Sequence, residues 1–238
     1  MRRAHNVLNL VDREVSLCFV YRTKKQTITL SAKGGLKMTD KNQEHKKNMV
    51  ELKAEQRAKV KSKKRAERGL FLLHTGDGKG KSTAAYGTLL RALGWGHDVA
   101  VLQYVKGNWK TGEKEFFKRF PELVRLEVMG EGFTWETQDR ERDIEAAEKA
   151  WKVSCEMLNS GEYDLVVLDE LNIVLRNDYL DKEMVKEGLL ARHPRTTVIV
   201  TGRNAPDNLI DAADLVTNME MIKHPFENGI KAARGIDF

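Results

Sequence analysis

One glycine-rich segment of this 238-residue chain reads Thr75-Gly76-Asp77-Gly78-Lys79-Gly80-Lys81-Ser82-Thr83. An apolar run at residues 70–74 precedes it, and a helical pattern over residues 83–93 follows it. Glycines let backbone N–H groups turn inward, and the helix adds its positive N-terminal end, so phosphate oxygens meet a ring of donors. The segment departs from the pattern G-x-x-x-x-G-K-[ST] only at Thr75, which stands where the first glycine belongs. We therefore predict that it binds a nucleoside triphosphate.

Four side chains are predicted to act on the phosphates and on a divalent cation. Lys81 supplies a full positive charge to the outer phosphates, and the Ser82 hydroxyl is placed to ligate magnesium. A buried strand at residues 165–168 ends in Asp169 and Glu170, at the sheet edge where ligands bind in open α/β folds. We expect Ser82, Asp169 and Glu170 to hold Mg²⁺ or Mn²⁺. Two interpretations of Glu170 stay open: a base that polarises water for attack on the γ-phosphate, or a metal ligand only.

From residue 69 onward, strands alternate with helices. Further strands are expected at residues 99–105, 124–128, 196–201 and 215–219, with a long amphipathic helix over residues 140–158. The strands are continuous apolar runs, which is typical of a parallel sheet covered by helices on both faces. The sequence therefore predicts an α/β domain over residues 69–238.

The basic character of the chain belongs to its N-terminal part. Residues 1–68 carry 19 Lys and Arg against 7 Asp and Glu, whereas residues 69–238 carry 22 against 28. The globular part therefore lacks the clustered positive charge that nucleic-acid binding requires. Residues 38–68 are predicted to form a basic helical arm, because they are rich in helix-forming residues. Its apolar stripe is thin, so the arm is either frayed and solvated or docked on a partner.

Residues 1–37 show little helical periodicity and no motif, and Met38 opens a segment that reads like a natural start. We expect residues 1–37 to be a non-native or disordered extension. Cys18 and Cys155 lie far apart without metal-binding spacing, which makes a disulfide framework or zinc site improbable. No apolar run approaches the roughly 20 residues of a membrane span. We expect a cytoplasmic protein with no membrane contact.

Two further features suggest ligand contacts. The segment Gly132-Phe133-Thr134-Trp135 puts two large aromatic side chains in a polar loop. They either fold back on the core or form a recognition surface for a flat apolar ligand. Arg203 follows the strand at residues 196–201, so it either reaches a ligand phosphate or is an ordinary surface arginine.

Taken together, these segments resemble one family, the P-loop type of ATP:corrinoid adenosyltransferase, from about residue 38 to residue 238. Small departures from the family pattern are Asp77 where Asn is common, Ser82 for Thr, and Phe238 for Tyr; residues 1–37 have no counterpart. Besides the phosphate loop, the matching segments are Val101-Leu102-Gln103-Tyr104-Val105-Lys106-Gly107, Gly132-Phe133-Thr134-Trp135 with Thr137-Gln138, Leu168-Asp169-Glu170-Leu171, Thr201-Gly202-Arg203, Lys223-His224 and Gly235-Ile236-Asp237-Phe238.

The resemblance implies a RecA-like P-loop fold, a homodimer and adenosylcobalamin synthesis from ATP and a corrinoid. The cobalt, reduced to Co(I) with help from a reductant protein such as a flavodoxin, attacks C5′ of ATP and expels the whole triphosphate. The phosphate loop and Arg203 would bind ATP, which in this family is thought to lie in reversed orientation. Lys81, Phe133 and Trp135 would be the catalytic residues, with both aromatic rings beneath the corrin, where they displace its lower axial ligand. The basic helix would lie over the active site, contributed in some cases by the partner subunit.

Two other functions remain as alternatives. One is a P-loop ATPase or kinase that acts at the γ-phosphate with Glu170 as base, which yields ADP rather than tripolyphosphate. The other is a RecA-like nucleic-acid binder that uses the basic arm, which predicts salt-dependent DNA binding that disappears when residues 1–68 are removed.

Overall fold

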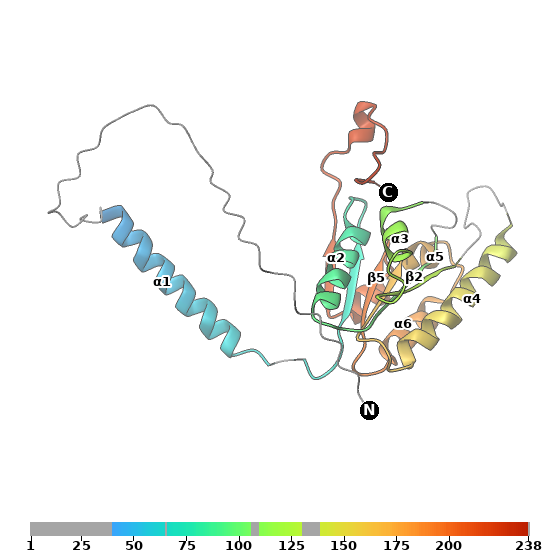
Figure 1. Cartoon of the computed structure of the whole chain (residues 1–238), viewed down its shortest axis with the longest axis horizontal. Helices are drawn as coiled ribbons and strands as arrows, with labels where there is room; N and C mark the ends of the chain where they lie inside the picture. Colours follow the sequence, from blue (N-terminus) through green and yellow to red (C-terminus); the bar gives the residue numbers. More distant parts are fainter. Residues whose placement is uncertain (1–39, 65, 106–109, 130–138, 238) are drawn as a thin grey trace, which may run out of the picture. The chain divides into compact units, whose positions relative to one another are not determined.

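A computed structural model of the chain describes residues 40–64, 66–105, 110–129 and 139–237. Its contacts divide the chain into two units, Met1–Lys63 and Lys64–Phe238. In the first unit, helix α1 (Asp40–Lys61) lies within the predicted basic arm, and every side chain described in it is exposed (Figure 1). The expected extension over residues 1–37 falls outside the described residues.

The second unit is built on one six-stranded sheet, in which every strand pair is parallel. The order across the sheet is β3-β2-β4-β5-β1-β6. The strands are β1 (Phe71–Thr75), β2 (Val99–Gln103), β3 (Arg125–Val128), β4 (Leu165–Asp169), β5 (Thr197–Thr201) and β6 (Leu215–Asn218).

Helices connect these strands, and the last strand leads into a short 3-10 turn near the C-terminus (Figure 1). They are α2 (Lys81–Gly94), α3 (Gly112–Phe117), α4 (Arg140–Asn159), α5 (Leu171–Arg176), α6 (Lys182–Leu190), α7 (Asp207–Ala212) and the 3-10 helix η1 (Pro225–Asn228). None of the helices in the described ranges is long and apolar enough to cross a bilayer.

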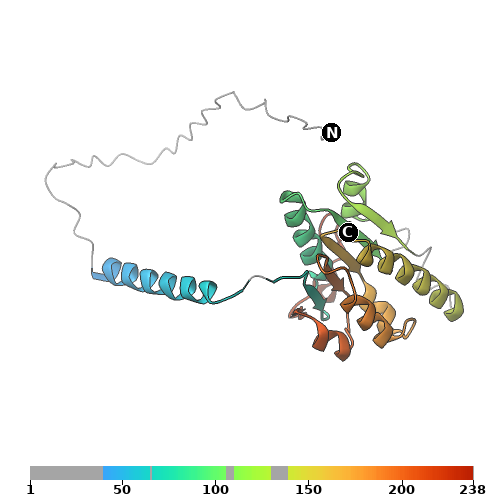
Figure 2. The same cartoon turned by 90° about the horizontal axis from the view of Figure 1, so that it is seen from below.

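The core consists of two apolar clusters, one on each face of the sheet. Along β2, Val99 and Val101 belong to the cluster with helices α2 and α3, whereas Ala100 and Leu102 belong to the cluster with α4, α5, α6 and α7. Successive side chains of a strand point to opposite faces, so a strand buried on both sides must be apolar throughout. The predicted α/β fold, with a parallel sheet covered by helices on both faces, is confirmed (Figures 1 and 2).

The strand order brings three strand ends together. Strand β5 lies between β1, which leads into the phosphate loop, and β4, which ends in the two carboxylates. Because all strands run in the same direction, their carboxyl ends meet at one edge, where ligands bind in folds of this kind. The predicted loop, carboxylate pair and Arg203 therefore converge on that edge.

The sequence prediction differs from the structure mainly in short elements. The helices α3, α5 and α7 have six residues each and were not predicted, because fewer than two turns give no readable periodicity. The strand expected at residues 99–105 ends at Gln103. Beyond it, Tyr104 is fully buried and its hydroxyl pairs with that of Ser154 on α4 at 2.6 Å.

Candidate nucleotide-binding site

The phosphate loop takes a conformation that requires glycine at two positions. Gly76 has a φ of 95° and Gly80 a φ of 116°, both in the left-handed region that residues with a Cβ rarely adopt. Gly80 is the N-cap of α2 and, having no side chain, provides no cap hydrogen bond. The first N–H groups of α2 thus keep their capacity to bind an anion from the loop side.

Close packing against the chain after β6 adds a second requirement for glycine. A Cβ at Gly78 would lie 2.5 Å from the carbonyl oxygen of Glu220, and the Gly78 N–H donates to the Met219 carbonyl at 2.6 Å. Thr75, by contrast, ends β1 without a left-handed φ, and its hydroxyl accepts a hydrogen bond from the Ala205 N–H at 3.1 Å. This explains why a threonine is tolerated where the usual pattern has glycine.

Lys81 holds its own loop together. Its Nζ donates to the carbonyl oxygens of Gly76 and Gly78, both at 2.7 Å, and the residue is 8% exposed. Burial lowers the pKa of the Lys81 ammonium, and the nearby Glu170 carboxylate partly opposes this. The charge that is predicted to meet the phosphates is therefore already at the centre of the loop.

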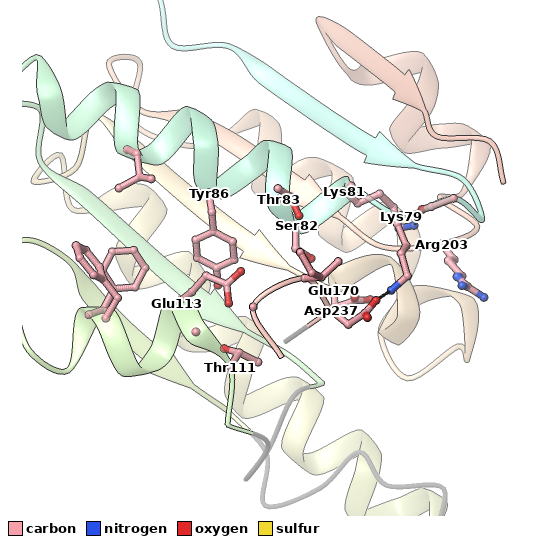
Figure 3. Close-up of a pocket in the computed structure, with 18 of the residues that line it drawn as sticks. Lys79, Lys81, Ser82, Thr83, Tyr86, Thr111, Glu113, Glu170, Arg203 and Asp237 are labelled. Carbon is pink, nitrogen blue, oxygen red and sulfur yellow. Dashed lines mark hydrogen bonds and ion pairs between the residues drawn. The ribbon is translucent and has the colours of Figure 1, made fainter. Parts of the chain in front are cut away.

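The two carboxylates after β4 occupy different environments. Asp169 is fully buried, and its Oδ1 and Oδ2 accept hydrogen bonds from the Thr201 hydroxyl at 2.8 Å and the Gln103 amide at 3.3 Å. Glu170 has a left-handed φ of 67°, and its N–H donates to the same Thr201 hydroxyl at 2.9 Å. That strained turn directs the Glu170 side chain to the cavity rather than the core (Figure 3).

A cavity of about 580 Å³ opens beside the loop, which is a size suited to a small-molecule ligand (Figure 3). Glu170, Arg203 and loop residues 78–83 all line this cavity. Thr75, Gly76 and Asp77 line a neighbouring hollow of about 400 Å³ instead. The polar and charged residues that line the larger cavity are Lys79, Lys81, Ser82, Thr83, Tyr86, Thr111, Glu113, Glu170, Arg203 and Asp237.

Several of these lining residues had no role in the sequence prediction. Tyr86 lies four residues after Ser82, and therefore on the same face of α2, a spacing that could have identified it. Its ring is 5% exposed, and its hydroxyl oxygen accepts a hydrogen bond from Gln103 Nε2 at 2.8 Å. Burial and the nearby Asp169 raise the pKa of the Tyr86 hydroxyl, so it stays protonated and can donate to a ligand.

The oxygen donors at this site fit a magnesium ion. Ser82 and Glu170 line the same cavity, with Asp169 behind them, and hydroxyl and carboxylate oxygens are the ligands Mg²⁺ prefers. Within the described ranges, no group of three or more His, Cys, Asp and Glu side chains is arranged to hold a metal. A cation that takes few protein ligands and completes its shell with phosphates and water suits such a site.

The predicted aromatic contacts, Phe133 and Trp135, lie outside the described residues. Arg203 is exposed and lines the cavity, next to Gly202, whose φ of 130° favours glycine. A Cβ at Gly202 would also lie 2.8 Å from that of Asn172. The turn that carries Arg203 is thus set by both backbone conformation and packing.

Comparison with known proteins gives four findings. The sequence model of a family described as ATP:corrinoid adenosyltransferase BtuR/CobO/CobP matches residues 67–238. A corrinoid adenosyltransferase of Pseudomonas aeruginosa is 51% identical over 199 residues, covering 84% of this chain and 98% of that protein. The corrinoid adenosyltransferase CobA of Salmonella typhimurium is 45% identical over 72% of this chain and 87% of its own length. Among solved structures, a KaiC-like protein from Pyrococcus horikoshii matches with a TM-score of 0.37 and 14% identity, over 66% of this chain and 75% of that one.

Proposed function

This chain belongs to the ATP:corrinoid adenosyltransferase family, and from that premise we propose that it transfers the 5′-deoxyadenosyl group of ATP to the Co(I) centre of a corrinoid, releasing triphosphate. The observation that carries the proposal is the cavity in which the phosphate loop, Glu170 and Arg203 meet. The bond between C5′ and its oxygen breaks, and both of its electrons leave with the triphosphate. The Co(I) electron pair forms the new carbon–cobalt bond.

The residues of the site are suited to stabilise a leaving group rather than to activate a nucleophile. Co(I) needs no general base, so the demands that remain are positioning and neutralisation of the departing charge. Lys81 and the N-terminal N–H groups of α2 would stabilise the triphosphate, and Arg203, which lines the same cavity, would add charge. Magnesium or manganese, held through Ser82, Glu170 and Asp169, would supply further neutralisation when bound.

Phe133 and Trp135 are proposed to lie beneath the corrin ring. There they would displace the lower axial ligand and keep water from the cobalt. Removal of a donor ligand makes Co(II) easier to reduce. The double variant Phe133→Ala with Trp135→Ala should therefore lose turnover with Co(II) substrate and a reductant, yet keep its reaction with chemically supplied Co(I). Equal losses with both substrates would contradict this role.

Product analysis tests the proposed reaction. The protein is incubated without oxygen with ATP, magnesium and a Co(I) corrinoid, while the absorbance of the corrinoid and the phosphate products are followed. We expect an adenosylated corrinoid and tripolyphosphate in equal amounts. ADP or orthophosphate as the only phosphate product would instead indicate an ATPase or kinase with Glu170 as base.

Several finer features belong to the same proposal. We infer a cytoplasmic homodimer that receives electrons from a reductant protein such as a flavodoxin. Residues 1–37 would be an extension, residues 38–68 a basic helix that covers the active site, and residues 69–238 the catalytic domain. Sedimentation of the purified chain tests the dimer, and a monomer at working concentration would remove it from the proposal.

A further inference from the structure

The C-terminal tail after β6 makes little contact with the domain that carries it. From Met221 to Ile236 every residue is exposed except His224, which is half-buried. Apolar side chains share this exposure: Phe226 is 75% exposed and Ile236 is 81% exposed. The hydrogen bonds made by this stretch stay within the tail itself, as in η1 and the turn that follows it.

Asp237 is the exception. One of its carboxylate oxygens pairs with Nζ of Lys79 in the phosphate loop, and the other accepts the N–H of Ala233 at 2.6 Å (Figure 3). Gly235, with a left-handed φ of 83°, makes the turn that brings the carboxylate back toward the loop. Across the described residues, the Lys79–Asp237 pair is the single hydrogen-bonded or ionic link between residues 221–237 and the rest of the domain.

The arrival of a polyphosphate changes the charge balance around this pair. Before it binds, three cationic and three anionic side chains line the cavity. A polyphosphate adds several negative charges beside the loop, and these repel the Asp237 carboxylate while they attract Lys79. Lys79 is 52% exposed as a side chain, so it can turn from one anion to the other at little cost. Besides the pair itself, the charged side chains that line the cavity are Lys81 and Arg203 against Glu113 and Glu170. His224, on the tail, also interacts electrostatically with Asp237.

We propose that Asp237 is an intramolecular competitor of the polyphosphate at Lys79: it pairs with Lys79 in the nucleotide-free enzyme, yields it to the triphosphate, and regains it as the product leaves. This inference rests on the proposed binding of triphosphate at the loop. It goes further by giving the tail a role in product release. A tethered carboxylate acts at a high effective concentration, so it can speed the departure of a tightly held polyanion without added ligand.

Binding of inorganic tripolyphosphate, the product itself, tests the exchange by calorimetry. Asp237→Asn should bind tripolyphosphate about 2- to 5-fold more tightly than the natural chain, the range expected when a partly exposed ion pair no longer competes. Its dissociation should be slower by a similar factor. Glu227→Gln, which removes the same charge from an exposed position of the same tail, should leave the affinity unchanged.

A double variant shows whether the effect passes through Lys79. In a Lys79→Ala background, Asp237→Asn should no longer change the affinity. If the tightening persists there, general repulsion rather than exchange is the cause, and the proposal is wrong. The proposal is also wrong if Asp237→Asn binds tripolyphosphate with the affinity of the natural chain, or more weakly.

Hydrogen exchange gives a readout that is independent of affinity. The amides of Ala233 and Asp237 are bonded within the turn that the ion pair anchors, so their exchange should rise when tripolyphosphate is added. Adenosine, which carries no phosphate, should leave it unchanged. Binding of tripolyphosphate without any rise in amide exchange would overturn the proposed role of Asp237 but leave the assignment of the phosphate loop standing. Failure of the natural chain to bind tripolyphosphate would overturn the loop assignment as well.

Discussion

Gln103, at the end of β2, links two polar side chains, Tyr86 and Asp169. Its Nε2 donates to both the Tyr86 hydroxyl and Asp169, while its buried Oε1 has no partner among the described residues. An unpaired buried acceptor beside the carboxylate proposed to hold the metal is suited to accept a hydrogen bond from a metal-bound water. The amide would thus fix the orientation of Asp169 and also contact the hydration shell of the ion.

Gln103→Leu should therefore weaken the binding of magnesium–ATP about tenfold, corresponding to one lost hydrogen bond to a charged group. The binding of ATP without magnesium should change much less. Calorimetry with and without the metal measures both affinities. Tyr86→Phe, which keeps the ring but removes the hydroxyl, should show a smaller loss in the same direction. Equal weakening with and without metal would contradict this role for Gln103.

Lys81→Ala should lower adenosyl transfer by at least about 100-fold, because it removes the positive charge that is proposed to stabilise the departing triphosphate. The assay is the rate of adenosylated corrinoid formation at saturating Co(I). Lys118→Ala, at the exposed C-cap of α3, is the matched control and should keep full activity. Near-normal transfer in Lys81→Ala would count against the loop assignment.

At the residue scale, the sequence predicted that loop residues, Glu170 and Arg203 meet at one site, but not how each side chain is held. The sequence placed Asp169 and Glu170 together at the end of one strand and left open whether Glu170 is a base or a metal ligand only. The left-handed turn at Glu170 separates them, and one hydroxyl, Thr201, serves both. Thr201 lies more than 30 residues away in sequence, and its partner strand is set by the sheet order. No local pattern could therefore have revealed the pairing.

Between elements, α4 and α6 approach closely because α6 has a glycine at the contact. A Cβ at Gly188 would lie 2.5 Å from Cζ2 of Trp151, which is 7% exposed. Alanine would raise helix propensity by about 1 kcal/mol, but overpacking a buried ring costs about 1–3 kcal/mol. We expect Gly188→Ala to lower the free energy of unfolding by about 1 kcal/mol, measured by urea denaturation.

Gly87 in α2 provides the opposite case. Nothing lies within 4 Å of a Cβ built there, so Gly87→Ala should gain helix propensity without a clash. It should raise the free energy of unfolding by up to about 1 kcal/mol. If both alanine variants shifted stability in the same direction, contact with Trp151 would not explain the effect at Gly188.

The start of β1 depends on an ion pair. Both guanidinium nitrogens of Arg68 donate to the Asp214 carboxylate, at 2.9 and 2.7 Å, and the Phe71 N–H donates to it at 2.8 Å. The Arg68 guanidinium and the Phe71 N–H together hold the pKa of the Asp214 carboxyl below its ordinary value of 3.8. The charged form thus favours folding. Its contribution is present above pH 3.8 and is lost as the pH falls through the lowered pKa.

Asp214→Asn should accordingly be less stable than the natural chain at pH 7, and the difference should shrink as the pH falls below the ordinary pKa. Unfolding by urea at a series of pH values measures it. A difference in stability that stays constant down to pH 3 would show that the charge of Asp214 contributes nothing.

At the scale of the elements, the apolar strands and the helices α2 and α4 could be predicted from the pattern of hydrophobic residues in the sequence. The short helices α5 and α7 did not, because tertiary packing holds them in place. Leu171 in α5 and Leu209 in α7 are fully buried against the sheet, and contacts of that kind leave no repeating pattern in a six-residue segment.

For the whole molecule, the division into Met1–Lys63 and Lys64–Phe238 predicts that the second unit folds by itself. A chain that begins at residue 64 should keep the urea midpoint of the full chain's cooperative transition, because both apolar clusters formed by the described residues lie in the second unit. Circular dichroism follows the transition. A clearly lower midpoint would show that residues 1–63 stabilise the domain. Adenosyl transfer by the shortened chain should fall if the basic helix covers the active site as proposed.

The tail described above also affects how the protein should be produced. An affinity tag fused after Phe238 would begin one residue from Asp237, the residue through which the tail reaches the phosphate loop. A histidine tag there would bring extra imidazoles and metal affinity next to the proposed site for magnesium and ATP. Nucleotide affinities measured on such a fusion would report partly on the tag, whereas a fusion at Met1 adds nothing to this end of the chain.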